Sequence, residues 1–408
     1  MMTRLAAVFA ACAAPRLAAL ALLPPAAPTP AWTLANALMR TGTFGTDGRP
    51  TTYLEPLYPA FLAALRLLTG DTTWLVLTAQ VLVTALGGVL LYRLADHVAG
   101  AGVAIVAAAI YACYPYLVAQ SIAYMDLNLT IVLMLAATLA LATMESDRGA
   151  VLTGVLFALL LLQRATFGFT LAAACVWLAW RGRGRAALVV AVTAAVAMSP
   201  WIARNLVVDG SLLPTRIGEN LLVSTSAFAE SVIPAYDVDP LMPLVYAEAA
   251  ASLPPDQADS QRALDRAMLS RALQFVREHP LRAARLKIRN ALSLLDPRLL
   301  PRYPAGEYTI AVVRNGRIEF TGLRARSRAQ ELVQAIAQTA VLICAAAAFA
   351  RRRLTIRDEP VLLVAATQAL VCVVFFPSTR LLAPAITLVF LYSAAGAVDL
   401  GRRIGAAR

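Results

Sequence analysis

Five charged residues stand at the ends of long apolar runs, where charged side chains are unusual: Glu55, Asp126, Arg164, Arg204 and Arg380. A charge within a membrane span is costly unless it is paired or hydrated, so such residues are candidates for function by default. Guanidinium groups bind phosphate through several N–H donors, and a carboxylate can act as a general base towards a hydroxyl group. Together the five residues would suit the binding of a lipid phosphate while a carboxylate activates an acceptor.

Each of these residues also has an ordinary structural interpretation. An arginine at a helix end usually extends its side chain to the lipid headgroups, and an acid at the boundary of a span often caps a helix. For any one residue this interpretation has at least equal weight. The functional hypothesis therefore depends on all five residues sharing one face of the membrane.

The composition is that of a membrane protein. Of the 408 residues 60% are hydrophobic and only 15% are charged, whereas soluble proteins contain about 25% charged residues. The mean hydropathy is +0.68. The formal net charge of +12 would fit a nucleic-acid-binding protein if the chain were soluble. Here the arginines cluster at the ends of apolar runs, as membrane topology requires, so we expect no nucleic-acid partner.

The sequence offers no support for a metal site or another cofactor. The cysteines stand singly within apolar runs, without the CxxC spacing of a metal or redox site. The two histidines, His97 and His279, lie far apart and have no cysteine or carboxylate at metal-ligand spacing. We therefore expect no metal and no other cofactor.

Apolar runs of about 20 residues, the length that crosses the hydrocarbon core as a helix, recur along the chain. The run 149–180 is too long for one span and contains Arg164, so we expect two short spans that meet there. With that run counted as two, the sequence predicts ten transmembrane helices, at 5–24, 73–96, 102–119, 127–144, 149–180, 186–205, 332–350, 359–377 and 381–398.

Two polar segments separate these spans. Within an N-terminal transmembrane module, 1–206, residues 26–71 are expected to form a first outer loop with an amphipathic interfacial stretch at 56–68. Residues 207–330 would form an outer, mainly helical domain with a short hairpin around an Asn-Gly turn. The C-terminal transmembrane helices then occupy 331–408.

Arginine clusters indicate which side of the membrane is cytoplasmic. They lie at 181–185, 351–357 and 402–408, and the positive-inside rule places all three in the cytoplasm. Both termini would then be cytoplasmic, and the domain 207–330 would face outward. The Ala, Arg and Leu bias, with Lys287 as the sole lysine, is typical of a GC-rich bacterial genome. We therefore expect a multi-pass protein of the bacterial inner membrane.

Several motifs, in order, resemble the membrane glycosyltransferases of the GT-C superfamily. The resemblance is to family 39 and its relatives, which include the protein O-mannosyltransferases and the lipid A aminoarabinose transferases. The strongest motif is PWIARN at 200–205, and its spacing to the later motifs matches bacterial members. The other matching segments are GSLLP at 210–214, GENL at 218–221, TGTF, GRPT and EPLYP within 41–59, QRA at 163–165, HP at 279–280 and RLLAP at 380–384.

The resemblance implies an all-α polytopic membrane fold, a GT-C-type bundle of about ten transmembrane helices with interfacial helices and a small periplasmic domain. It also implies transfer of a hexose or pentose from a polyprenyl-phosphate donor to a lipid, glycan or protein acceptor at the outer face. Arg164, Arg204 and Arg380 would hold the phosphate and Asp126 would orient an arginine. Tyr58, in the first-loop motif, is a further candidate substrate-binding residue.

The chain departs from the family pattern at one position. Relatives typically carry an aspartate soon after the first span, four residues before a tyrosine, as the catalytic carboxylate. When Trp32 is aligned with that tyrosine, Pro28 occupies the place of the aspartate. We therefore assign the catalytic carboxylate to Glu55, with Asp47 as the alternative from the same loop. A member with an altered or inactive site is the remaining interpretation.

Two other classes of protein stay open. A lipid-linked oligosaccharide ligase or polymerase would also combine many spans, outward arginines and an outer loop, but would take a diphosphate-linked donor. A transporter or scaffold without catalytic activity is the alternative that is not an enzyme.

Overall fold

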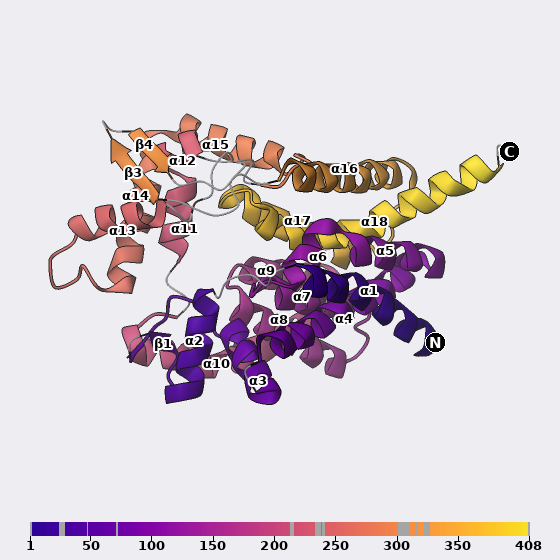
Figure 1. Cartoon of the computed structure of the whole chain (residues 1–408), viewed down its shortest axis with the longest axis horizontal. Coiled ribbons are helices and arrows are strands. Elements are labelled where there is room, and N and C mark those ends of the chain that lie inside the picture. Colours follow the sequence, from indigo (N-terminus) through magenta and orange to yellow (C-terminus); the bar gives the residue numbers. More distant parts are fainter. Residues whose placement is uncertain are drawn as a thin grey trace.

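The structure is a computed structural model of the whole chain. It describes residues 2–23, 29–46, 48–70, 72–212, 216–232, 238, 241–300, 310–314, 317–321 and 327–406. Within these residues the chain is almost entirely helical, and its strands form two short hairpins (Figure 1). The predicted all-α polytopic fold is therefore confirmed.

The apolar runs form the helices of a membrane bundle. These helices are α1 (Met2–Leu22), α4 (Thr73–Ala99), α5 (Ala101–Cys113), α6 (Pro115–Ser121), α7 (Leu127–Ala142), α8 (Asp147–Gln163), α9 (Phe167–Trp180), α10 (Gly184–Asp209), α16 (Arg328–Arg351), α17 (Glu359–Val374) and α18 (Thr379–Ala406). Among the described residues, five helices are long and apolar enough to cross a membrane, or six if α5 and α6 form one span. The protein is a multi-pass membrane protein, and the ten crossings stay a prediction.

The run 102–119 was expected to form one straight span, but it is bent by 57° between α5 and α6. Pro115 begins α6, and a residue before proline is disfavoured in the helical conformation, so Tyr114 is extended. The bend leaves the last carbonyl groups of α5 without helical partners. The fully buried Arg16 of α1 donates to two of them, those of Tyr111 at 3.0 Å and Ala112 at 3.3 Å.

The bundle is packed around one large apolar cluster that joins α1, α4, α5 and α7 to α16, α17 and α18. The helices α18 and α16 approach each other closely, since a Cβ atom on Gly396 would lie 1.9 Å from the carbonyl oxygen of Cys344. Only glycine fits at this crossing, because the obstacle is backbone and cannot move aside. The middle of α18 is thereby packed directly against α16.

The first loop carries two helices and a small hairpin at one end of the bundle. Its elements are α2 (Pro30–Thr41), β1 (Gly45–Thr46), β2 (Arg49–Pro50) and α3 (Leu57–Thr69). The strands are antiparallel, with Gly45 opposite Pro50. The amphipathic stretch expected at 56–68 is the helix α3, which packs on α2 and α4. Asp47 lies outside the described residues.

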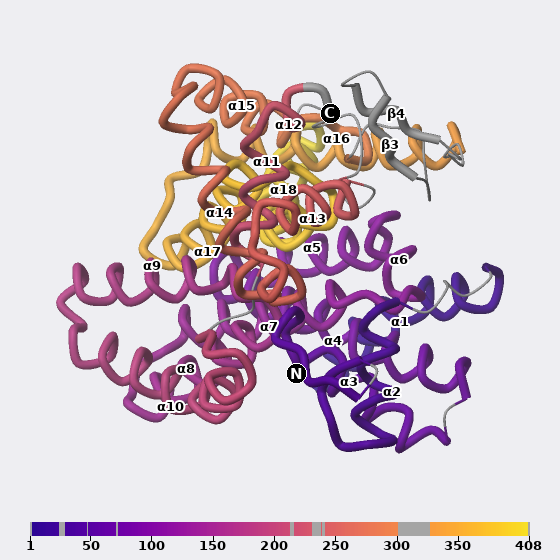
Figure 2. The backbone as a smooth tube through the Cα atoms, turned by 90° about the vertical axis from the view of Figure 1, so that its left-hand side faces the viewer, coloured from indigo at the N-terminus to yellow at the C-terminus, as the bar shows by residue number. Residues whose placement is uncertain are grey.

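The segment between α10 and α16 is mainly helical in its described residues. It contains α11 (Ile217–Ser224), α12 (Ala227–Val232), α13 (Met242–Ala251), α14 (Gln261–Glu278), α15 (Pro280–Ser293) and the antiparallel pair β3 (Ile310–Arg314) and β4 (Arg317–Thr321). The turn residues 315–316 lie outside the described residues. Figure 2 views the molecule from the side on which this segment lies. In that view α11 to α15 lie in front of α17 and α18, while α2 and α3 lie in front of α4. The two groups of helices therefore flank the same end of the bundle.

Candidate active site

The break between α8 and α9 positions two candidate residues. Arg164 leaves the helix in an extended conformation, with φ −154° and ψ 117°, and α9 begins three residues later. The backbone N–H of Ala165 is thereby freed from helical hydrogen bonding, and it donates to Oε1 of Glu55 at 3.0 Å. The break thus places the Glu55 carboxylate next to the residue that follows Arg164.

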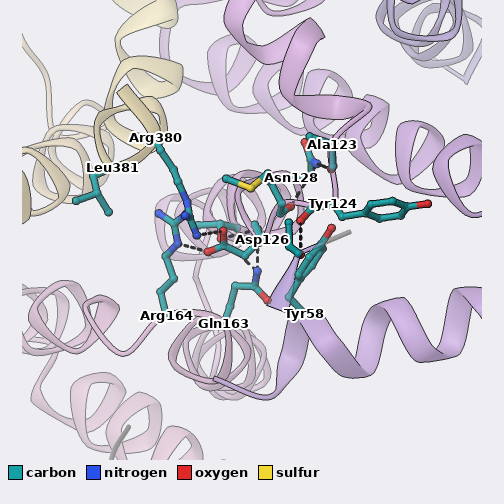
Figure 3. A network of polar contacts seen from close by, with 12 residues as sticks. Tyr58, Ala123, Tyr124, Asp126, Asn128, Gln163, Arg164, Arg380 and Leu381 are labelled. Carbon is teal, nitrogen blue, oxygen red and sulfur yellow. Dashed lines mark hydrogen bonds and ion pairs between the residues drawn. The ribbon is translucent and has the colours of Figure 1, made fainter. Parts of the chain in front are cut away.

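Asp126 joins two arginines from distant parts of the chain. Its Oδ2 lies 2.6 Å from Nε of Arg164, and its Oδ1 lies 2.7 Å from Nη2 of Arg380 (Figure 3). The side chains of Arg164, Asp126 and Arg380 are 10%, 17% and 47% exposed. Nη2 of Arg164 is buried and has no hydrogen-bond partner among the described residues. This cluster has one more positive than negative charge and a spare buried donor, so it can accept an anion.

The loop that carries Asp126 is fixed by neighbouring amide side chains. Nδ2 of Asn128 donates to the carbonyl groups of Gln120, Ala123 and Met125. Nε2 of Gln163 donates to the carbonyl oxygen of Asp126 at 2.7 Å. The carboxylate therefore projects from a rigid loop towards both guanidinium groups.

Tyr58 is buried and stands behind this loop. Its hydroxyl donates to Oε1 of Gln80 at 2.7 Å, and Nε2 of Gln80 donates to the carbonyl oxygens of Ser121 at 2.9 Å and Ala123 at 2.8 Å. Tyr58 thus supports the loop before Asp126, as Figure 3 shows. A direct contact of Tyr58 with substrate stays a prediction.

Arg204 contacts the first loop. Its Nη2 donates to the carbonyl oxygen of Phe44 at 2.8 Å, and its Nη1 donates to that of Thr51 at 2.6 Å. The guanidinium carbon also lies 4.8 Å from the centre of the Trp201 ring. These contacts hold the backbone that leads to Glu55, whereas a phosphate contact of Arg204 stays a prediction.

Two further contacts restrain the same part of the loop. The hydroxyl of Thr52 donates to the carboxylate of Asp209 at the end of α10. The guanidinium of Arg216 lies 4.7 Å from the centre of the Tyr53 ring and is paired with the fully buried Glu219. Residues 51–53 are therefore anchored one after another, with only Leu54 between them and Glu55.

An apolar groove of about 350 Å³ opens beside these residues. It lies between the start of α3, the end of α8 and the last turns of α10, and is lined by Pro56, Leu57, Ala60, Leu162, Ala197, Pro200 and Trp201. Its lining directly adjoins Glu55 in sequence, and it includes Leu162, two residues before Arg164. An apolar chain in this groove would place a polar head near the charged cluster.

Lys287 and Asn290, which were not predicted as site residues from the sequence, hold the turn before Arg380. Nζ of Lys287 donates to the carbonyl oxygen of Val374 at 2.5 Å and to Oγ1 of Thr225 at 2.6 Å. Nδ2 of Asn290 donates to the carbonyl oxygens of Val373 and Phe375, both at 3.1 Å. A cation near the C-terminal carbonyl groups of α17 also complements the helix dipole. The sequence did offer one indication that Lys287 has a special role, because it is the only lysine in the chain.

Burial lowers the pKa of Lys287 to about 8. The ammonium group should therefore lose its proton between about pH 7 and 9, well below the ordinary lysine pKa of about 10.4. Because the chain has one lysine, growth with ¹³C-lysine gives a single side-chain Cε signal whose NMR shift can be followed with pH. Protein unfolded in denaturant is the control and should titrate near the ordinary value. If Lys287 in the folded protein also had a pKa near 10.4, its buried position against the end of α17 would be wrong.

The described residues contain no group of three or more His, Cys, Asp or Glu side chains that could hold a metal ion. Activity without a metal stays a prediction. The fold and the site together define a multi-pass α-helical membrane protein with a charged cluster and an apolar groove at one end of its bundle.

Part of the sequence matches a known protein family, and the fold is similar to that of solved membrane proteins. Residues 49–203 match the family described as dolichyl-phosphate-mannose-protein mannosyltransferase. The fold is similar to that of the archaeal oligosaccharyltransferase AglB from Archaeoglobus fulgidus, solved with an inhibitory peptide and a dolichol-phosphate, with a TM-score of 0.52 and 13% identity. That match covers 99% of this chain and 52% of AglB, so the chain spans about half the length of AglB.

Two structures of ArnT from Cupriavidus metallidurans are also similar, each with a TM-score of 0.43. The apo form is 16% identical over 98% of this chain and 78% of ArnT. The form bound to undecaprenyl phosphate is 15% identical over 98% of this chain and 79% of ArnT. No curated protein sequence matches the chain. The match to the mannosyltransferase family and the fold shared with AglB confirm the resemblance to the GT-C membrane glycosyltransferases.

Proposed function

We propose that this protein is a glycosyltransferase that moves a sugar from a polyprenyl-phosphate donor to an acceptor hydroxyl at the outer face of the bacterial inner membrane. The acceptor would be a lipid, glycan or protein. The family match over residues 49–203 and the fold shared with AglB, which was solved with a dolichol-phosphate, support a transferase of this class.

One observation carries the proposal: Arg164 and Arg380 converge on Asp126 while Glu55 is bonded to the residue after Arg164. The two guanidinium groups, one with a spare buried donor, would bind the donor phosphate and stabilise the negative charge that develops on it as the sugar leaves. Asp126 would keep both arginines in place. Glu55 would accept the proton of the acceptor hydroxyl as that oxygen attacks the anomeric carbon.

The geometry favours a positioning role for Arg204. Its hydrogen bonds to the carbonyl groups of Phe44 and Thr51 order the loop that leads to Glu55. The apolar groove between α3, α8 and α10 would receive the first isoprene units of the donor, because it is apolar and its lining includes Pro56, next to Glu55 in sequence, and Leu162, two residues before Arg164. The lipid tail and the phosphate would then be bound by neighbouring parts of one site.

Binding of the bare carrier lipid tests this proposal without knowledge of the sugar. The purified protein should bind undecaprenyl phosphate more tightly than undecaprenyl diphosphate, as measured by native mass spectrometry with both lipids in competition. A monophosphate with a single isoprene unit should bind more weakly than either, because it leaves most of the groove empty. Preference for the diphosphate would instead support an oligosaccharide ligase or polymerase, and no binding of either lipid would support a transporter or scaffold.

The proposed topology has both termini in the cytoplasm and residues 207–330, which include α11 to α14, outside. Single cysteines introduced at Ser260, which caps α14, and at Gly184, which begins α10, provide a direct test. In intact cells, a membrane-impermeant thiol reagent should modify the Ser260→Cys protein and spare the Gly184→Cys protein. The reverse pattern would invert the topology and place the charged cluster on the cytoplasmic face.

A further inference from the structure

The helix α15 buries apolar side chains in its first half, Ala283 and Leu286, but has an inverted distribution of polarity in its second half. Its inner face, packed against the protein, includes the polar residues Asn290, Ser293 and Lys287. Its outer face carries aliphatic side chains: Ile288, Leu292 and, one residue past the C-cap, Leu295 are 62%, 65% and 67% exposed. In a helix surrounded by water the apolar stripe faces the protein core, so this arrangement indicates an apolar environment outside α15.

The position of α15 places that outer face next to the membrane bundle. Asn290 and Lys287 bond to the C-terminal end of α17, and Leu294 packs against the main apolar cluster of the bundle. Figure 1 shows α15 beside α17 and leading towards α16, a helix long and apolar enough to span a membrane. The aliphatic face is therefore at the edge of the bilayer that the bundle itself occupies.

We propose that α15 is an interfacial helix whose aliphatic face, Ile288, Leu292 and Leu295, lies among the lipid acyl chains next to α17. The exposed Arg285 stands one turn before Ile288, between that residue and the exposed Leu281. An interfacial helix combines aliphatic side chains that enter the acyl boundary with basic side chains at the headgroups. The outer domain would then end before α15, and α15 would anchor it in the membrane.

A second protein molecule fits this face less well than lipid does. Stable protein interfaces bury roughly 800 Å² on each partner, with some 20–30 residues a side, which three aliphatic side chains cannot supply. Lipid needs no such area, because each exposed aliphatic group gains independently from leaving water. The inference does not depend on the proposed transferase activity.

Photolabelling of the unmodified protein tests the inference. The protein is placed in nanodiscs of phosphatidylethanolamine and phosphatidylglycerol that contain a phospholipid with a diazirine in its acyl chain. After irradiation, tryptic peptides are examined for attached lipid. Peptide 290–298 contains Leu292 and Leu295, and peptide 329–351 from α16 is the positive control. Peptide 272–277 of α14 is the matched negative control, because its Leu273 and Val276 are also exposed, at 43% and 38%.

We expect peptide 290–298 to carry lipid at a level comparable to peptide 329–351, while peptide 272–277 remains unlabelled. Absence of label from 290–298, with 329–351 labelled, would overturn the inference. If peptide 290–298 carried no label and native mass spectrometry showed that the protein is a dimer in the nanodisc, the aliphatic face of α15 would be an interface between two copies. Equal labelling of 272–277 and 290–298 would likewise overturn it, because the label would then report exposed aliphatic groups and not membrane depth.

Discussion

Replacement of Glu55 with Gln is expected to lower sugar transfer by about 10²–10⁴-fold, because it removes the proposed general base. The substitution keeps the shape of the side chain, and the Gln oxygen can still accept the hydrogen bond that Ala165 N–H now gives to Glu55. The amount of folded protein and the affinity for undecaprenyl phosphate should therefore hardly change. Turnover is measured as release of polyprenyl phosphate from a polyprenyl-phosphate sugar in membranes that contain the protein.

Glu278→Gln is the matched control, since Glu278 is an exposed carboxylate at the end of α14, and its turnover should equal that of the native protein. A Glu55→Gln protein with nearly normal turnover would exclude Glu55 as the base. Asp47→Asn would then be the next variant to measure. If that variant were active too, the catalytic carboxylate would not come from the first loop.

The helical architecture could be predicted from the sequence because apolar runs of membrane length have few alternatives to helix. The break at Arg164 was also predictable, since the run 149–180 is too long for one span and contains a charge. The bend at Tyr114 was missed, although Pro115 signals it, because apolar composition continues across the bend. Apolar composition predicts which residues form helices, but it does not predict where the helix axis bends.

The sequence indicates which residues belong to the charged cluster, but it does not indicate which of them form pairs. Asp126, Arg164 and Arg380 stand out because ionisable residues are rare in the apolar runs, and the structure brings them into contact. Arg204 has the same residue type and a similar position at a helix end, yet its contacts are with the first loop. The partner of each arginine depends on how helices far apart in the sequence cross each other. These crossings cannot be predicted from a single sequence.

Replacement of Arg380 or Arg164 with Ala should weaken undecaprenyl phosphate binding by about 10- to 150-fold. A hydrogen bond to a charged group contributes about 1.5–3 kcal/mol, which corresponds to that range of affinity. The Arg164 variant should also lose thermal stability, because Asp126 keeps only one cation and its carboxylate is mostly buried. Affinity is measured by titration of the purified protein with undecaprenyl phosphate, and stability by thermal unfolding in the same detergent.

Two further arginine variants decide whether these losses come from the phosphate contact. Arg185 forms an exposed ion pair with Asp147, so Arg185→Ala removes a guanidinium of similar chemistry and should leave affinity unchanged. Arg204→Ala should lower turnover and leave affinity for the carrier nearly intact, because Arg204 orders the loop that leads to Glu55. If Arg204→Ala weakened carrier binding as strongly as Arg380→Ala, Arg204 would be a phosphate ligand after all, and the loop would have to rearrange when the donor binds. If neither Arg164→Ala nor Arg380→Ala changed affinity, the phosphate would bind elsewhere, and the ion pairs of Asp126 would serve only to hold α7, α8 and α18 together.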